Sequence, residues 1–109
     1  MTDLIRKPIK EWEGYYEVDN MGNVYSLDRV ITVEDHGRIY RKLIKGRVTK
    51  GTKTSHGYMV VQLCRGKVTQ RKYVHQLVAE AFIPNPYGYD VINHIDENKQ
   101  NNRADNLEW

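Results

Sequence analysis

Hydrophobic and polar positions alternate in the first third of the chain. Apolar and acidic side chains alternate from residue 16 to residue 19. An Asn-Met-Gly-Asn segment follows, and apolar residues return at 24–27. A spacing of two residues around a segment rich in Asn and Gly is typical of two antiparallel strands joined by a turn. Residues 12–27 are therefore predicted to form a β-hairpin, with residues 1–10 as a frayed lead-in.

The next segment alternates less clearly. Residues 29–33 are an arginine followed by four β-branched residues, which we expect to extend the first sheet. The Asp-His-Gly sequence at 35–37 indicates a turn, and residues 38–43 a further short strand. Residues 46–57 are rich in Gly, Thr, Ser and Lys, so they are expected to form a loop.

The clearest pattern lies between residues 58 and 83. Two strand-like segments, 58–63 and 68–74, flank an Arg-Gly-Lys turn, which predicts a second hairpin. The apolar spacing then changes to three and four residues, so residues 75–83 are predicted to form a helix that ends before Pro84. These elements indicate the α+β class, with small antiparallel hairpins and one central helix.

Composition bounds the size of the core and the setting of the protein. The chain has 109 residues, of which 39% are apolar, which leaves room for one domain or two small lobes. Trp12 and Trp109 are expected in the core, and His75 is expected to pack at the start of the helix. Cys64 is the only cysteine, which excludes an intramolecular disulfide and a cysteine-based zinc site and fits a cytoplasmic setting. No signal peptide and no apolar stretch of about 20 residues is present, so a membrane is not an expected partner.

Charge is distributed unevenly, although the net charge is only +3. Residues 38–75 carry eleven Lys and Arg and no Asp or Glu, whereas residues 1–37 and 76–109 are both acidic. A long segment without acid indicates a surface that meets a polyanion such as nucleic acid. A strand-rich segment with lysines along its edges would show the same composition. The residues expected to contact phosphates are Lys42, Lys45, Arg47, Lys50, Lys53, Arg65, Lys67, Arg71 and Lys72.

The C-terminal segment combines residue types that suit phosphodiester hydrolysis. This reaction needs a base that deprotonates water, a cation on the phosphate and stabilisation of the leaving oxygen. His94 is a candidate base, and the Asn93 side chain offers an oxygen to a hard divalent cation. Asn106 follows in the same segment and is placed to fix the loop or the imidazole. Taken singly, a histidine near an apolar strand is more often structural, and Asn-rich loops are more often plain turns.

The joint spacing of these residues carries a family resemblance. Segments 74–83, 93–96, 98–102 and 106–109 resemble those of the HNH homing endonucleases of phages and their introns. Residues 12–27, which begin Trp-Glu-Gly-Tyr-Tyr, are similar to the small nuclease-associated module that precedes the HNH core in that family. The two blocks follow each other in the family's usual order, which makes the match specific.

The resemblance implies a metal-dependent endonuclease that cleaves double-stranded DNA through a ββα-metal core. It assigns the general base to His94, a metal ligand to Asn93 and the orientation of the loop that holds the base to Asn106, with Mg²⁺ or Mn²⁺ as the cation. Relatives often have Asp at the ligand position, so the neutral Asn93 is expected to bind the metal more weakly. The resemblance also divides the chain into a β-rich nuclease-associated module at 1–50 and an HNH core at 51–109.

One part of the ββα motif is expected beyond the residues given. In relatives, a helix with a further metal-binding His or Asn follows the segment that matches 106–109, whereas this chain ends at Trp109. This polypeptide, a monomer or weak dimer with a truncated core, is therefore expected to bind Mg²⁺ poorly and to cleave DNA weakly or not at all. A non-catalytic, sheet-based DNA-binding protein with a vestigial nuclease segment is the main alternative, and RNA binding by the basic strands is a remote one.

Overall fold

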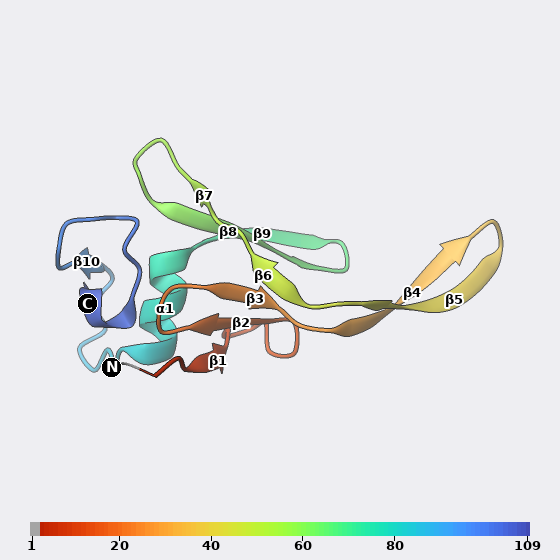
Figure 1. The fold of residues 1–109 in the computed structure, drawn as a ribbon, viewed down its shortest axis with the longest axis horizontal. Helices are drawn as coiled ribbons and strands as arrows, with labels where there is room; N and C mark the ends of the chain where they lie inside the picture. Colours follow the sequence, from red (N-terminus) through yellow and green to blue (C-terminus); the bar gives the residue numbers. More distant parts are fainter. Residues whose placement is uncertain (1–2) are drawn as a thin grey trace.

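Antiparallel strands dominate the fold. The computed structural model describes residues 3–109 (Figure 1). The strands of the two larger sheets are β1 (Arg6–Pro8), β2 (Tyr16–Asp19), β3 (Val24–Ser26), β6 (Arg47–Thr49), β7 (Thr52–Lys53), β8 (Met59–Arg65) and β9 (Val68–Tyr73). The other elements are β4 (Arg29–Asp35), β5 (Arg38–Ile44), α1 (Val74–Phe82), β10 (Asn93–His94), the 3-10 turn η1 (Ala104–Asn106) and β11 (Leu107–Glu108). The sheet orders are β1-β2-β3-β6 and β7-β8-β9, while β4 pairs with β5 and β10 pairs with β11.

The two predicted hairpins and the predicted helix are present. β2 pairs with β3, and β8 pairs with β9, in antiparallel register. α1 begins one residue earlier than predicted, and it buries Val74, Leu77, Val78 and Ala79. The α+β class is thus confirmed. Trp109, expected in the core, is only half-buried, and its indole N–H donates to a backbone carbonyl. Within residues 3–109, no helix has the length and apolar content needed to cross a bilayer.

Three predictions about local structure were wrong. The expected lead-in contains β1, which pairs with β2 in antiparallel register, with Arg6 opposite Asp19. β1 is therefore an edge strand of the first sheet. Residues 29–33 do not extend the first sheet, because they pair with β5 in a sheet of their own. The expected loop at 46–57 contains β6 and β7, which add an edge strand to each larger sheet. Such short edge strands are set by their pairing partners, so their Gly- and Thr-rich sequence gave little signal.

One hydrophobic core joins both larger sheets to α1. Val18 and Val24 of the first sheet, Leu63 of the second and Val78 of α1 are almost fully buried. Leu107 of β11 packs in the same cluster. The other buried members are Ile9, the predicted core residue Trp12, Tyr16, Val61, Val74 and Leu77. Burial of this shared apolar surface holds the first sheet, the second sheet, the helix and the C-terminal strands in one body.

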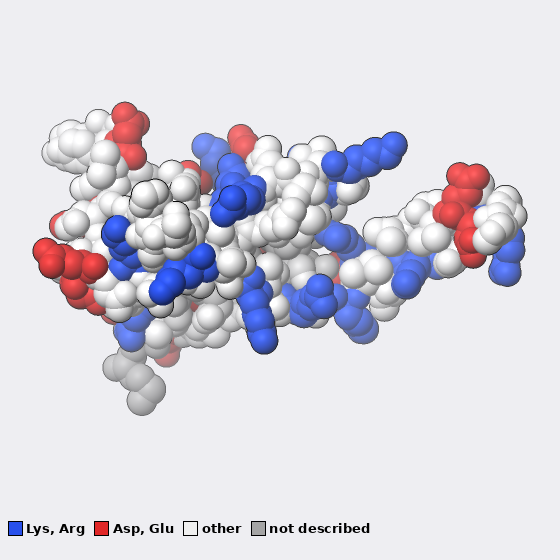
Figure 2. Space-filling model, turned by 90° about the horizontal axis from the view of Figure 1, so that it is seen from above, with Lys and Arg blue, Asp and Glu red and all other residues white. Residues whose placement is uncertain are grey.

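An arm, defined as residues 29–44 of β4 and β5, extends away from this body (Figure 1). It lies along the longest dimension of a molecule that measures 54 × 31 × 27 Å. Its apolar side chains are open to solvent, with Val30 61% and Ile39 74% exposed. Lys and Arg side chains gather around the point where the arm joins the body, whereas acidic side chains lie near its far end (Figure 2). A two-stranded ribbon of this kind buries little surface of its own and leaves its side chains free to meet a partner.

Candidate active site

His94 lies on β10, in the short ladder that pairs it with Leu107 of β11. The side chain is buried, and its Nε2 lies 2.8 Å from Oδ1 of Asn102. Because an amide oxygen only accepts, Nε2 carries the hydrogen and the lone pair of the neutral ring is on Nδ1. His94 Nδ1 makes no hydrogen bond among residues 3–109, so its lone pair is free to accept a proton.

An aromatic cluster covers one side of His94. The His75 ring, in the first turn of α1, lies 5.2 Å from the His94 ring in an edge-to-face arrangement, and the Tyr58 ring lies at 6.2 Å. Lys99 Nζ lies 4.7 Å from the centre of the Tyr58 ring. Burial, together with the neighbouring His94, lowers the pKa of His75 to about 4. His75 is therefore uncharged near neutral pH, and its Nδ1 is a buried polar atom without a partner in the described chain.

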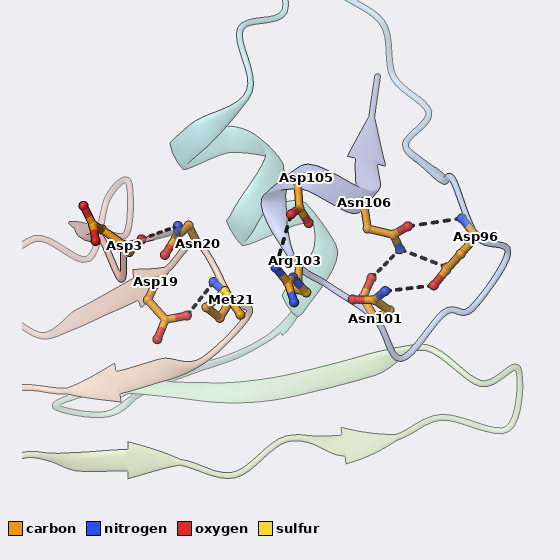
Figure 3. Close-up of polar contacts among 9 residues, drawn as sticks. All are labelled: Asp3, Asp19, Asn20, Met21, Asp96, Asn101, Arg103, Asp105 and Asn106. Atoms are coloured by element: carbon orange, nitrogen blue, oxygen red, sulfur yellow. Dashed lines mark hydrogen bonds and ion pairs between the residues drawn. The ribbon is translucent and has the colours of Figure 1, made fainter. Parts of the chain in front are cut away.

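Asn106 fixes the loop that follows His94, and it does not touch the imidazole. Its Nδ2 donates to Asp96 Oδ1 at 2.9 Å and to the Asn101 carbonyl at 2.8 Å (Figure 3). Its Oδ1 accepts from the Asp96 backbone N–H at 3.1 Å. Hydrogen bonds from Asn101, the backbone of Asn98 and Asn106 lower the pKa of Asp96, so the loop is organised around a carboxylate. The sequence left open whether Asn106 holds the loop or the ring, and the geometry selects the loop.

Asn93 precedes His94 on the same short strand. Its side chain is exposed, whereas that of His94 is buried. Asn93 Nδ2 donates to Glu108 Oε1 at 2.8 Å across the β10–β11 pair. Among residues 3–109, no three His, Cys, Asp or Glu side chains come together as a metal-binding group. The Asn93 amide oxygen and the Glu108 carboxylate are the oxygens that these two strands could offer to a cation, and Mg²⁺ commonly uses one or two protein oxygens together with water and phosphate.

The turn between β2 and β3 braces the residue that holds His94. The backbone N–H of Ala104 donates to the Asn20 carbonyl at 2.8 Å, which ties the C-terminal loop to this turn. Gly22 has φ +93°, and a Cβ at this position would lie 3.0 Å from the Asn102 carbonyl oxygen. The Asn20 side chain is itself fixed, because its Nδ2 donates to the backbone carbonyl of Asp3 at 2.9 Å (Figure 3). Asn102 is thus positioned from the first sheet as well as from its own loop.

The nine basic residues predicted to contact phosphate are not one continuous surface. Lys45, Arg47 and Lys50 line a single hollow at the root of the arm. Arg65 lies over the ring of Trp12 at 4.9 Å and donates to the Glu11 carbonyl at 2.8 Å. The remaining residues are spread over the arm (Lys42), β7 (Lys53), the turn after β8 (Lys67) and β9 (Arg71 and Lys72). The structure thus brings three of the nine predicted basic residues together in one hollow, whereas Arg65 packs over the ring of Trp12.

Three contacts of His94 were not predicted from the sequence, those with Asn102, His75 and Tyr58. Asn102 is one of several asparagines in a polar loop, and only its separation of eight residues from His94 hints at the contact. His75 was interpreted as a packing residue, and its neighbour Tyr58 as part of a strand surface. Their approach to His94 depends on how β8, α1 and β10 pack, which local patterning does not report.

Two family models match this chain. The model described as the NUMOD4 motif matches residues 5–64, and the model described as HNH endonuclease matches residues 72–109. The chain is 34% identical over 106 residues to the DNA endonuclease I-HmuI of Bacillus phage SP01, covering 94% of this chain and 50% of that protein. It is 40% identical over 73 residues to the uncharacterized HNH endonuclease L245 of Acanthamoeba polyphaga mimivirus, covering 67% of this chain and 22% of that protein. The chain thus spans at most about half the length of these relatives.

The fold is also similar to a solved structure. The match is to a chain in the work titled "DNA binding and cleavage by the HNH homing endonuclease I-HmuI". The TM-score is 0.72 at 33% sequence identity, and the match covers 96% of this chain and 51% of that chain. The likeness therefore extends over both the N-terminal sheet and the segment that carries His94.

Proposed function

Because this chain belongs to the HNH homing endonuclease family and carries an N-terminal NUMOD4 motif, we propose that it is a metal-dependent endonuclease that hydrolyses phosphodiester bonds in double-stranded DNA. The contact between His94 and Asn102 carries the proposal, since it leaves one imidazole nitrogen free to take a proton. The substrate class is supported by I-HmuI, which is named as a DNA endonuclease. In this proposal residues 1–50 form the nuclease-associated module and residues 51–109 the HNH core.

His94 acts as the general base. Its Nδ1 removes a proton from the attacking water, while Asn102 Oδ1 accepts the Nε2 hydrogen and stabilises the imidazolium that forms. An imidazole suits this step because its ordinary pKa lies close to neutral pH. The neighbouring His75 is neutral, so it adds no positive charge that would oppose protonation of His94. Asn106 contributes by keeping the loop around Asp96 in one conformation.

Asn93 is the residue of this chain that would hold the cation, with Mg²⁺ or Mn²⁺ as the ions of suitable hardness. A bound cation at this position would draw charge from the scissile phosphate and stabilise the leaving oxygen. The amide is a neutral ligand, and the nearby Glu108 carboxylate supplies the negative charge closest to it. We therefore propose weak metal affinity for these residues.

Nicking of a supercoiled plasmid in Mg²⁺ or Mn²⁺ tests this function. We expect slow nicking by residues 1–109 that is lost in His94→Ala, while affinity for duplex DNA is unchanged. Binding should weaken with salt, with log K falling against log salt at a slope of about −5 if six cations meet phosphates. Nicking that is equally strong in His94→Ala would remove His94 as the base, and a salt slope near zero would remove DNA as the partner.

The scarcity of metal ligands favours a second candidate function. A sheet-based DNA-binding protein without catalysis would need no cation, and no group of three acidic, His or Cys side chains is present in residues 3–109. Salt-sensitive duplex binding with no His94-dependent nicking in either cation would select this alternative. We propose a monomer or weak dimer in both cases, and sedimentation at binding concentrations checks this state.

A further inference from the structure

An open hollow of about 710 Å³ lies where the arm joins the body. Its walls come from the two larger sheets and from the root of the arm. Ser26 of β3 and residues 47–49 of β6 form one side, Gln62 and Cys64 of β8 another, and Arg29 and Ile44 the end nearest the arm. The hollow is therefore built by three separate sheets, and its shape depends on the packing of the whole body.

The hollow has a strong excess of positive charge. Four cations line it, namely Arg29, Lys45, Arg47 and Lys50, and none of its described lining residues is acidic. Arg47 and Lys50 form no ion pair among residues 3–109, and Lys45 makes only an exposed contact of 3.8 Å with Asp28. Uncompensated cations that converge on one concave surface attract an anionic ligand.

The lining favours phosphate groups over bases. Tyr16 is the aromatic side chain at the wall, and its hydroxyl accepts from the backbone N–H of Cys64 at 2.9 Å while its ring packs against Trp12. No exposed aromatic face in the described lining is thus available to stack on a base. Guanidinium and ammonium groups, with Ser26 and Gln62 beside them, are donors suited to phosphate oxygens.

The position of the hollow fits a backbone held at a distance from the cleavage site. Tyr58, which contacts His94, and Gln62 of the hollow wall are four residues apart at β8, roughly 13 Å of strand. One strand of duplex DNA carries a phosphate about every 3.4 Å along the axis, so this span corresponds to a few nucleotides. Phosphates bound here would fix which phosphodiester bond reaches His94.

We infer that this hollow seats the phosphate backbone of double-stranded DNA a few nucleotides from the scissile bond, with Arg29, Arg47 and Lys50 as its contacts. The inference rests on the proposed function and adds Arg29 to the residues that meet DNA.

Duplex binding and the reactivity of Cys64 test the inference together. A fluorescent 30-base-pair duplex is titrated with wild type, Arg47→Gln, Lys50→Gln and the matched control Lys10→Gln, at several salt concentrations. Lys10 is exposed and does not line the hollow. Each hollow variant should reduce the steepness of the salt slope by about 0.9 and the affinity at 0.1 M salt about eightfold, whereas Lys10→Gln should change neither.

Cys64 reports on occupancy, because it is the only cysteine and lines the hollow. Saturating duplex should slow its alkylation several-fold in wild type. Hollow variants that bind like Lys10→Gln, or Cys64 reactivity unaffected by saturating duplex, would overturn the inference. Stronger protection by single-stranded RNA than by duplex would overturn the assignment to DNA. If the wild-type protein shows no salt-dependent binding of duplex DNA, the proposed function fails as well. If the wild-type protein binds duplex DNA, and Lys67→Gln lowers the salt slope while the hollow variants do not, only the inference about the hollow fails.

Discussion

His94 is held by one short hydrogen bond and by an aromatic cluster in which His75 is the nearer ring, and each can be removed by itself. Asn102 accepts from Nε2 at 2.8 Å, and the His75 ring lies 5.2 Å away on another element. The first contact sets which nitrogen is free, and the second limits the orientations of the ring. Together they make a small set of side chains responsible for the state of the base.

Replacing Asn102 with Ala should disturb the tautomer of His94. Without the carbonyl oxygen, Nε2–H loses its partner and the two neutral tautomers approach equal population. Long-range ¹⁵N–¹H NMR should show one tautomer in wild type and a mixture in the variant, and nicking should fall by about 10- to 100-fold. Gln100→Ala, an amide deletion in the same loop, is the matched control. An unchanged His94 spectrum in Asn102→Ala would contradict the assigned contact.

His75 should make stability depend on pH. Its pKa is about 4 in the folded protein and near 6.5 in an unfolded chain, so between these values the unfolded state binds the extra proton. Stability is therefore lost as pH falls through 6.5 towards 4. The drop in the urea midpoint from pH 7.5 to pH 5 should be smaller in His75→Phe than in wild type. His36→Gln, at a side chain 96% exposed, should retain the wild-type drop. An equal drop in all three proteins would contradict this origin.

Residue types at the site were easier to predict than their contacts. His94 and Asn93 stand together in the sequence, so a base beside an oxygen ligand followed from chemistry and from the family resemblance. The choice between Asn102 and Asn106 as the partner of the imidazole did not follow, because both are asparagines after the same strand. The conformation of the loop determines which asparagine contacts the imidazole, because Asn106 is hydrogen-bonded to Asp96.

The arm is the element that sequence patterning described least well. Residues 29–33 have the β-branched composition of a sheet strand, and their alternation gives no sign that both faces remain in solvent. By contrast, α1 and β8 followed their periodicities closely, because each buries one face. The turn at 35–37 and the strand at 38–43 were predicted and are present, but periodicity reports burial and does not show that these two strands pair only with each other.

Removing the outer arm should leave the body folded. Val30 and Leu43 are directly paired, so residues 31–42 can be replaced by Asn-Gly, which suits a two-residue hairpin turn. The thermal midpoint should change little, since the core residues lie elsewhere. Loss of Arg38, Arg41 and Lys42 should reduce the steepness of the salt slope of duplex binding by at most about 3. Unaltered binding at every salt concentration would show that the arm does not meet DNA.

At the scale of the whole molecule, one core spans the two proposed modules, residues 1–50 and residues 51–109. Val18 and Val24 belong to the first, while Leu63, Val78 and Leu107 belong to the second, and all lie in the same cluster. A single cluster of this size favours one cooperative unfolding unit. The boundary at residue 50 is thus a division of sequence that the packing does not repeat.

Separate halves should therefore fail to fold. Residues 1–50 and residues 51–109, expressed apart, would each expose the apolar face that the other covers. We expect neither half to give a sigmoidal urea transition, whereas residues 1–109 should give one transition with the same midpoint by fluorescence and circular dichroism. A cooperative transition in either half would show that the core is divisible.

The close approach of Gly22 to Asn102 limits how such proteins can be recombined. A chimera that joins a foreign N-terminal module to this nuclease segment would inherit a different residue against the loop that steadies the imidazole. A side chain there would press on the Asn102 backbone, in addition to requiring the positive φ that glycine tolerates. Donor modules with glycine at this turn are therefore expected to leave the position of Asn102 least disturbed.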